Sequence, residues 1–445
     1  MPPYSLAAVA RPFVHLVERW YPDAYVFAIA LTFVTLALAV ALTDTAPLEA
    51  VDLWGAGLSG LLAFTTQIAL TLVFAHALAH TDAAQRLLST VAHLPRSAFA
   101  AYGTVAVATS AASLVAWSLG LAAGALLARE VARTGAARGL ALDYPLLVAS
   151  AYSGFVVWHM GYSGSAPLAV ATPGHALEAT TGLLPVTETI LAPWNLAMIL
   201  AVVPIVALTC ALMAPASPTR FAPEPQPQPR NDDLAHTPGQ RMERARMLSF
   251  AVGALAALWL ARHFLRAGPA LDLNVVNWSF LAAGLLLARS PLHYVQLVTN
   301  AGATLGPILL QYPFYAGIMG LMTGSGLVVV FSDFFVAFAS AETLSFWAFL
   351  CGGVVNFFVP SGGGQWVVQG PVFVDAAARL GASVPEVVMG IAYGDQWSNL
   401  IQPFWTIPLL AIAGLPMRRV LGYTFVTFLV SGIAFGAGLL LIGAL

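Results

Sequence analysis

The sequence predicts an all-α polytopic membrane protein with two inverted-topology repeats, each holding a re-entrant helical hairpin and a broken transmembrane helix. Composition, the spacing of apolar runs and the placement of arginine predict this fold. Of the 445 residues, 59% are hydrophobic and 9% are charged, whereas soluble domains carry about a quarter charged residues. The formal charge of −2 argues against a nucleic-acid partner. The expected environment is therefore the lipid bilayer.

Apolar runs of about 20 residues, the length that crosses a bilayer, predict the spans. Two further runs, 98–128 and 344–378, are too short for two crossings and too long for one. Nine full spans are predicted, at 24–43, 57–79, 144–172, 189–213, 248–266, 274–289, 304–323, 384–412 and 420–444.

Arginine fixes the expected orientation, because cytoplasmic loops are enriched in basic residues. All 18 basic residues are arginine, and twelve of them lie in the N-terminal segment, in loops 81–97 and 129–143, and in the Pro-rich segment 214–247. Loops 44–56 and 173–188 have none. We therefore expect a cytoplasmic N-terminus, a cytoplasmic linker over 214–247 and an external C-terminus.

The same reasoning predicts that the runs 98–128 and 344–378 are hairpins. Loops 81–97 and 129–143 are both internal, so run 98–128 enters from inside and turns near Ala116–Gly120. Loop 324–343 is external and has no arginine, so run 344–378 enters from outside and turns at Pro360–Gly364. Non-helical backbone at that depth is tolerated only where protein or a cavity surrounds it.

A short pattern that occurs in both halves supports two repeats of opposite orientation. Ala151-Tyr152 precedes Pro167-Leu168 at the same spacing as Ala392-Tyr393 precedes Pro408-Leu409. Three units are predicted. The first repeat, 1–213, holds scaffold helices, a hairpin and the broken helix 144–172, and the linker follows it. The second unit, 248–445, holds an extra span and the second repeat with its hairpin and the broken helix 384–412. Secondary transporters commonly have this plan.

Polar residues in the second broken helix are candidates for cation coupling. Asp395, Asn399 and Gln402 stand at i, i+4 and i+7 and would share one helical face, before Pro403 and Pro408 interrupt the helix. A carboxylate inside a span marks a coupling or substrate site; alternatively, Asp395 pairs with a distant arginine or caps a helix. The coupling set that we predict is Asp395, Asn399, Gln402 and Ser361.

The stretch WHMGYSGSAP, 158–167, describes an equivalent unwound segment in the first half. His159 is either a proton carrier or a neutral ring bonded to a carbonyl. Trp366, Trp397 and Trp405 are either pocket walls or packing residues. Helix N-termini at the breaks attract an anion, and free carbonyls can hold a cation. No arginine lies in the middle of an apolar run, so a small monoanion is favoured over a dicarboxylate.

Long stretches of the chain resemble the bacterial short-chain fatty acid transporter family, which includes acetoacetate/butyrate permeases. The resemblance covers nearly the whole chain and is weakest in the linker. It rests on PSGGGQWVVQGP, IAYGDQWSNLIQPFW, LLAREVAR, DYPLLVASAYSGF, YSGSAPLAVATPG and QYPFYAGI.

The resemblance implies an inner-membrane carrier of short-chain fatty acid anions, related to the ion transporter superfamily, whose members are homodimers with a scaffold and an elevator-like transport domain. It implies no cofactor beyond a coupling ion, Na⁺ or H⁺, with Na⁺ near Ser118, Ser361 and Asn399. The implied substrate residues are Ser118, Ser163, Ser165, Ser361, Gly362, Gly363, Gly364, Gln365, Trp366, Asn399 and Thr406.

The sequence departs from the family pattern at the first hairpin and first broken helix. Ala116-Trp117-Ser118 stands where Asn-Trp-Gly is expected, and His159-Met160 stands where glycines are expected. The superfamily's Ser-Asn-Thr signature is missing from both tips, so the resemblance alone does not imply sodium coupling.

Two other classes of function remain open from the residues. One is a carrier or channel for another small organic anion. The other is a rhomboid-like intramembrane serine protease, because Gly161-Tyr162-Ser163-Gly164 matches a GxSG pattern and His76 or His175 could serve as base. Neither the hairpins nor Asp395 would be explained by a protease, so we expect a protein that is not an enzyme.

Overall fold

The computed structural model describes residues 12–14, 19, 22–175, 177–220, 237–268, 273–302 and 305–444. Every regular element in this part of the chain is a helix, which confirms the predicted all-α class. The predicted linker lies largely outside the described residues, at 221–236, and so does most of the N-terminal segment.

The first half contains α2 to α11. Their bounds are α2 (Ala24–Leu42), α3 (Pro47–Gly57), α4 (Leu62–Ala79), α5 (Asp82–His93), α6 (Ala98–Val115), α7 (Trp117–Ala137), α8 (Tyr144–Gly154), the 3₁₀ helix η1 (Phe155–Met160), α9 (Ser165–Val170), α10 (Glu178–Thr181) and α11 (Pro193–Leu212).

The second half contains α12 to α22. Their bounds are α12 (Pro238–Arg244), α13 (Arg246–Ala267), α14 (Leu273–Leu287), α15 (Pro291–Gly302), α16 (Gly306–Gly324), α17 (Leu327–Val336), α18 (Leu344–Val355), α19 (Gly362–Leu380), α20 (Val384–Ser398), α21 (Pro403–Ala413), the 3₁₀ helix η2 (Met417–Arg419) and α22 (Leu421–Gly443).

Within the described residues, six helices are long and apolar enough to cross a membrane: α2, α4, α6, α11, α13 and α22. The bent pair α15–α16 raises the number to seven if it is one span. Of the nine predicted spans, 274–289 corresponds to α14, which has 15 residues. The two broken helices consist of shorter pieces. By length, α6 can cross a membrane by itself, although the sequence assigns it to a hairpin.

Several segments that the sequence assigns to loops are helical. Segment 44–56 holds α3, segment 81–97 holds α5, and segment 324–343 holds α17. These helices have 10 to 12 residues, so a search for runs of about 20 apolar residues passes over them. α7 also continues to Ala137 rather than ending near 128, because buried Val131 and Ala132 extend its apolar face.

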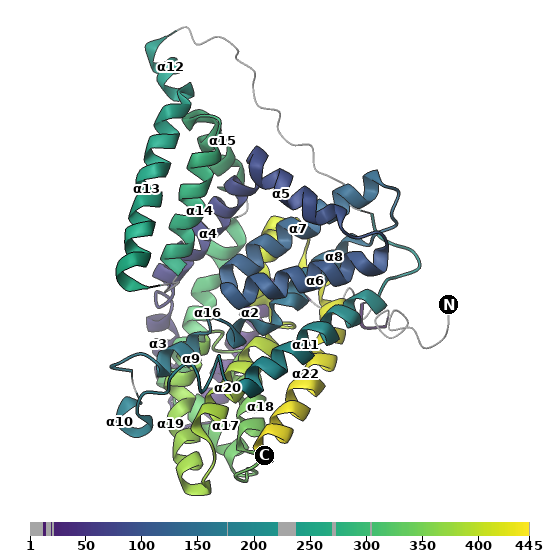
Figure 1. Ribbon diagram of the computed structural model, residues 1–445. Helices are drawn as coiled ribbons and strands as arrows, with labels where there is room; N and C mark the ends of the chain where they lie inside the picture. Colours follow the sequence, from purple (N-terminus) through teal and green to yellow (C-terminus); the bar gives the residue numbers. More distant parts are fainter. Residues whose placement is uncertain are drawn as a thin grey trace.

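α4 and α14 anchor one end of the molecule, with α13 and α15 packed against them (Figure 1). On this side the Arg289 guanidinium donates to both carboxylate oxygens of Asp82, at 2.7 and 3.1 Å. The pair ties the start of α5 to the α14–α15 turn, and it holds the pKa of Asp82 below its usual value. Both side chains are more than half exposed. Because solvent screens the two charges, the pair contributes little to the free energy of unfolding.

The two hairpins turn in the same local conformation. Ala116 separates α6 from α7 and is extended, with φ −152° and ψ 129°. Ser361 precedes α19 and is also extended, with φ −151° and ψ 104°. The hairpins differ in packing, because α6 lies against α7 whereas α18 lies mainly against α20. Glycines permit the latter contact: a Cβ on Gly394 would lie 2.2 Å from the carbonyl oxygen of Phe349.

The two halves contact each other reciprocally. α7 of the first hairpin packs on α21 of the second broken helix, and α19 of the second hairpin packs on α9 of the first. η1 contacts α20, and α11 lies beside α22 (Figure 1). Both hairpins therefore meet the break of the opposite half, and this contact positions the site.

Candidate functional site

The break in the first broken helix caps the first hairpin. The backbone N–H of Trp117, the first residue of α7, donates to the Ser163 hydroxyl at 2.8 Å. The Tyr162 N–H donates to the carbonyl of Leu114 at 2.7 Å. Ser118 is buried in the first turn of α7. The predicted residues Ser118 and Ser163 therefore lie at one tip, and Ser163 satisfies a helix N-terminus.

The same break also reaches the second hairpin. The Gly363 N–H donates to the Ser165 hydroxyl at 3.0 Å, and the Gly364 N–H donates to the Ser361 hydroxyl at 3.3 Å. Residues 161–165 thus supply one hydroxyl to α7 and another to α19. Because helix N-termini carry partial positive charge, two such charges converge on this break.

His159 and Asp395 form the buried centre of this arrangement. The imidazole Nδ1 donates to the carbonyl of Ala392 at 3.0 Å, and Nδ1 lies 3.6 Å from Asp395 Oδ2. Nε2 lies 2.9 Å from the Ser165 hydroxyl, which donates to it when the ring is neutral. His159 therefore has the carbonyl bond that one of its two interpretations expects.

Gly362, at the second tip, packs directly against His159 and Asp395. A Cβ at this position would lie 1.9 Å from His159 Cε1 and 2.7 Å from Asp395 Oδ2. A side chain there would overlap the imidazole, since carbon atoms in contact sit about 3.5–4.0 Å apart. The glycine is required because the backbone touches the pair.

The Asp395 carboxylate is fully buried, and the Asn399 amide approaches it as a donor without reaching good hydrogen-bond geometry. It lies inside α20 and caps no helix, and no arginine of the described chain pairs with it. A buried charge without partners is costly. Among the described residues, neither structural alternative for Asp395, an arginine pair or a helix cap, is found.

An amide network joins the second hairpin to the second broken helix. Asn356, at the end of α18, donates to Asn399 Oδ1 at 2.6 Å and accepts from Gln365 at 3.3 Å. Gln369 donates to Gln365 Oε1 at 2.7 Å, so these two side chains share one face of α19. Asn399 and Gln402 flank a break rather than continuing the face of Asp395, because α20 ends at Ser398.

Gln402 begins the next helix. Its side chain caps α21 by accepting from the Phe404 N–H at 2.9 Å, and the Thr406 hydroxyl donates to the Gln402 carbonyl at 3.0 Å. Pro403 occupies the first turn of α21, as expected for a residue without an N–H. Pro408 lies within α21 and does not interrupt it, so the prediction of a second break there is wrong.

Buried donors without acceptors are concentrated in these elements. Gln396 Oε1 and Gln402 Oε1 accept from backbone N–H groups, which leaves their amide nitrogens as the unused ends. Six such donors have no acceptor among the described residues: the indole nitrogens of Trp158, Trp366 and Trp405 and the amide nitrogens of Gln396, Asn399 and Gln402. A ligand with acceptor oxygens would satisfy them.

Aromatic rings fill the space between the first tip and α21. Trp117 lies 4.9 Å from Trp405 and 6.5 Å from Trp158, between ring centroids. Phe64 of α4 lies 5.8 Å from Trp405. Trp397 instead stacks on Phe428 of α22 and donates to its carbonyl at 2.7 Å, so Trp397 is a packing residue.

Sequence reasoning passed over three amide residues that hold this site together. Asn195 of α11 donates to the carbonyl of Met160 at 3.1 Å and accepts from the Tyr393 hydroxyl at 2.6 Å. Gln396 accepts from the His159 N–H at 2.9 Å. Asn356 is the third. A polar residue alone in an apolar run is the signal that would have found Asn195 and Asn356.

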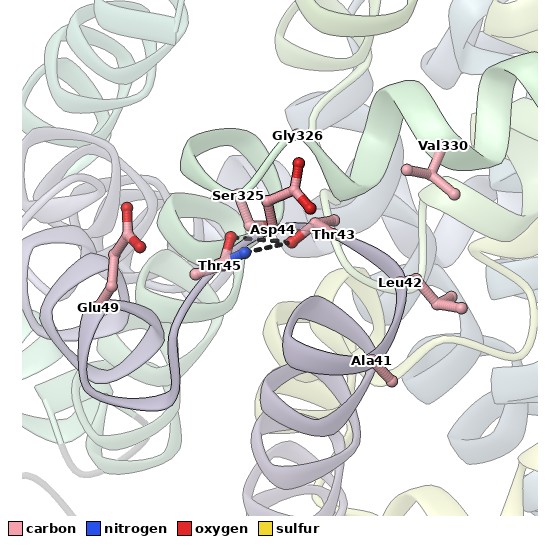
Figure 2. Close-up of a pocket in the computed structure, with 9 residues that line it drawn as sticks. All are labelled: Ala41, Leu42, Thr43, Asp44, Thr45, Glu49, Ser325, Gly326 and Val330. Carbon is pink, nitrogen blue, oxygen red and sulfur yellow. Dashed lines mark hydrogen bonds between the residues drawn. The ribbon is translucent and has the colours of Figure 1, made fainter.

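Two clefts open on the described surface. The larger, about 600 Å³, lies between the end of α2 and the start of α17, and no predicted site residue lines it (Figure 2). Thr43 and Thr45 bond to each other there at 2.8 Å. The smaller, about 370 Å³, reaches Val359 and Gly364 beside the second tip. Only the smaller cleft adjoins the site.

Ser165, His159 and Asp395 are the residue types of a hydrolytic triad, but their geometry is different. In a triad the carboxylate accepts the Nδ1 proton, whereas here Ala392 accepts it. The Ser163 hydroxyl of the GxSG pattern caps α7 rather than bonding to a base.

Ser163→Ala is expected to destabilise the protein by about 0.5–2 kcal/mol, because a helix N-terminus loses its cap. Thermal unfolding of the detergent-solubilised protein measures this. Ser59→Ala, at an exposed turn residue, is the matched control and is expected to unfold at the wild-type temperature. Equal unfolding temperatures for both variants would contradict a capping role for Ser163.

Comparisons with known proteins place this chain among transporters. The family model described as "Short chain fatty acid transporter" matches residues 5–442. Two relatives carry the provisional name of short-chain fatty acid transporter. The one from Escherichia coli (strain K12) is 39% identical over 98% of this chain and 100% of its own length. The one from Haemophilus influenzae is 37% identical over 98% and 99%.

Solved structures give weaker likenesses. The Alcanivorax borkumensis YdaH transporter covers 95% of this chain and 98% of its own at 16% identity, with a TM-score of 0.46. Neisseria gonorrhoeae MtrF, of a class of antimetabolite efflux pumps, covers 95% and 97% at 15% identity, with a TM-score of 0.38. Both scores are below 0.5, so no argument rests on them.

The matched family and both relatives are transporters, which confirms the prediction that the protein is not an enzyme and rules out the protease alternative. The match extends over almost the entire length, including both hairpins, both broken helices and Asp395. The chain belongs to the short-chain fatty acid transporter family.

Proposed function

We propose that the protein is a secondary active transporter that carries short-chain fatty acid anions, such as acetoacetate and butyrate, together with a cation. The observation that carries this proposal is the set of six buried donors without acceptors, on or beside the broken helices and α19. An ionised carboxylate has two oxygens with about four lone-pair sites and no donor. It could accept from up to about four of these six donors, which a cationic solute without acceptor oxygens could not do.

The proposed coupling site is Asp395 with His159. A buried carboxylate beside a neutral imidazole carries one net negative charge, and uptake of one proton makes the pair neutral. Burial favours the neutral state, so a proton bound here can travel with the anion and be released on the other side. A sodium ion near Ser118, Ser361 and Asn399 is the alternative coupling ion.

We further propose that the two halves are inverted-topology repeats and that transport follows an elevator mechanism in a homodimer of the bacterial inner membrane. The matching conformations of Ala116 and Ser361 support the repeat. The reciprocal contacts of α7 with α21 and of α19 with α9 support it as well. In this arrangement the N-terminus is cytoplasmic, the C-terminus is external, and both hairpins are re-entrant.

Uptake of radiolabelled butyrate into proteoliposomes tests the function, with a proton gradient and a sodium gradient imposed separately. Short carboxylic acids cross bilayers when protonated, so protein-free vesicles set the background. We expect accumulation at least tenfold above that background with the proton gradient and none above it with the sodium gradient. The reverse result would move the coupling site to the sodium alternative, and no uptake in either gradient would contradict the proposed substrate.

A carrier or channel for another small organic anion is the remaining alternative. The buried carboxylate favours a coupled carrier over a channel, because a channel needs no site that binds and releases a cation. The same vesicles separate the two: a channel equilibrates labelled butyrate across the membrane but never accumulates it against its gradient.

A further inference from the structure

The cleft of about 370 Å³ lies between the second hairpin and the α3–α16 pair. It is almost wholly apolar. Gly57 and Gly60 line it from the α3 side, Ala316 to Thr323 from α16, and Val367 and Val368 from α19; Thr323 supplies the only polar side chain. A cleft of this character binds hydrocarbon rather than charge.

Glycines bring α3 and α16 together along one wall of this cleft. A Cβ on Gly57 would lie 2.8 Å from the carbonyl oxygen of Ala316, and one on Gly320 would lie 2.7 Å from Gly57 Cα. α3 and α16 therefore touch through their backbones. The α3–α16 pair forms one wall of the cleft, and α19 forms another.

The cleft borders the second tip. Val359 and Gly364, which line it, flank the tip residues Pro360 to Gly363. The Gly363 N–H is held by Ser165, and the Gly364 N–H reaches the Ser361 hydroxyl at 3.3 Å, a long bond that a carboxylate could replace. A molecule in the cleft therefore has an apolar wall along its length and the second tip at its end.

We propose that this cleft receives the hydrocarbon chain of the transported carboxylate, while the carboxylate lies at the first turn of α19. The inference rests on the proposed function and adds to it the side chains that select chain length. Met319 and Val368, which are half-buried in the wall, set the size of the space. Each methylene that enters is expected to tighten binding roughly fourfold, until the cleft is full.

Competition measures this selection in proteoliposomes that contain the full chain. Labelled acetate is taken up in the presence of unlabelled acetate, propionate, butyrate, hexanoate or octanoate, each over a range of concentrations. In the wild type we expect the half-inhibitory concentration to fall with each methylene from acetate to butyrate, and then to level off.

Val368→Phe narrows the cleft and Met319→Ala widens it. We expect Val368→Phe to weaken inhibition by butyrate and hexanoate tenfold or more and to leave acetate within twofold. Met319→Ala is expected to move the optimum to a longer chain. Val252→Phe, at a 57% exposed site on α13, is the control and should keep the wild-type profile.

Chain-length profiles equal to the wild type in both cleft variants would overturn the proposal, and this is the result expected if a membrane lipid fills the cleft. Equal loss of all five acids in both variants would overturn it too, because selection would then not be separable from folding. Both results leave the proposed function intact if the wild type still transports. A wild type that transports none of the acids refutes the function, and the cleft proposal with it.

Discussion

Asp395→Asn is expected to abolish accumulation of butyrate against its gradient, a loss of at least tenfold in the steady-state ratio, while exchange across the membrane continues. The asparagine has nearly the same shape as a protonated aspartic acid but cannot release a proton. A carrier fixed in this state still binds and moves the anion, so labelled butyrate outside should exchange with unlabelled butyrate inside at half the wild-type rate or more. The measurement is net uptake and counterflow in the same vesicles.

The expected effect on stability separates this variant from a folding defect. A fully buried carboxylate that no arginine of the described residues neutralises opposes folding, so replacing it with a neutral amide should leave the unfolding temperature unchanged or raise it. Asp375→Asn is the matched control. That carboxylate lies on α19 in an exposed pair with Arg379 at 2.7 Å, and its loss should change neither transport nor stability. If Asp395→Asn still accumulates butyrate, Asp395 is not the coupling residue.

Much of the helical architecture could be predicted from apolar runs, because a bilayer demands a minimum length. α2, α11, α13 and α22 lie within about four residues of the predicted limits at each end. Short helices were not predicted, for the same reason. α3, α5 and α17 are too short or too polar to be recognised as spans. Some helix ends depend on a cap from a distant residue, as the N-terminus of α7 depends on the Ser163 hydroxyl. Predicting such an end requires knowledge of the tertiary contact.

The candidate site was predictable by residue type but not by partner. Glycines, serines and a lone carboxylate predicted where the backbone breaks, and those breaks occur at 116, at 161–164, at 356–361 and at 399–402. What the sequence could not indicate is that Ser165 faces the second hairpin, or that His159 and Asp395 approach each other over more than two hundred residues. Such pairs depend on how the two halves pack, and local spacing carries no information about that.

Gly362→Ala is expected to eliminate uptake, to the level of protein-free vesicles, and to destabilise the protein by about 1–3 kcal/mol. The added methyl would lie 1.9 Å from His159 Cε1 and 2.2 Å from Nε2, so the tip must move away from the pair. Gly363→Ala is a control one residue along. Its Cβ would lie 3.6 Å from Ser165 Cβ, an ordinary contact, and alanine favours a helix more than glycine does. We expect Gly363→Ala to unfold at close to the wild-type temperature.

The double variant Gly362→Ala/His159→Ala decides whether steric overlap is the cause. Removing the imidazole makes room for the methyl, so the unfolding temperature should recover most of what Gly362→Ala lost, and the two changes should be strongly non-additive. Proton-driven accumulation should stay absent, because His159 is half of the proposed proton site, although counterflow should return. Additive losses in the double variant would mean that the second tip does not press on His159, and that the pair and the hairpin act independently.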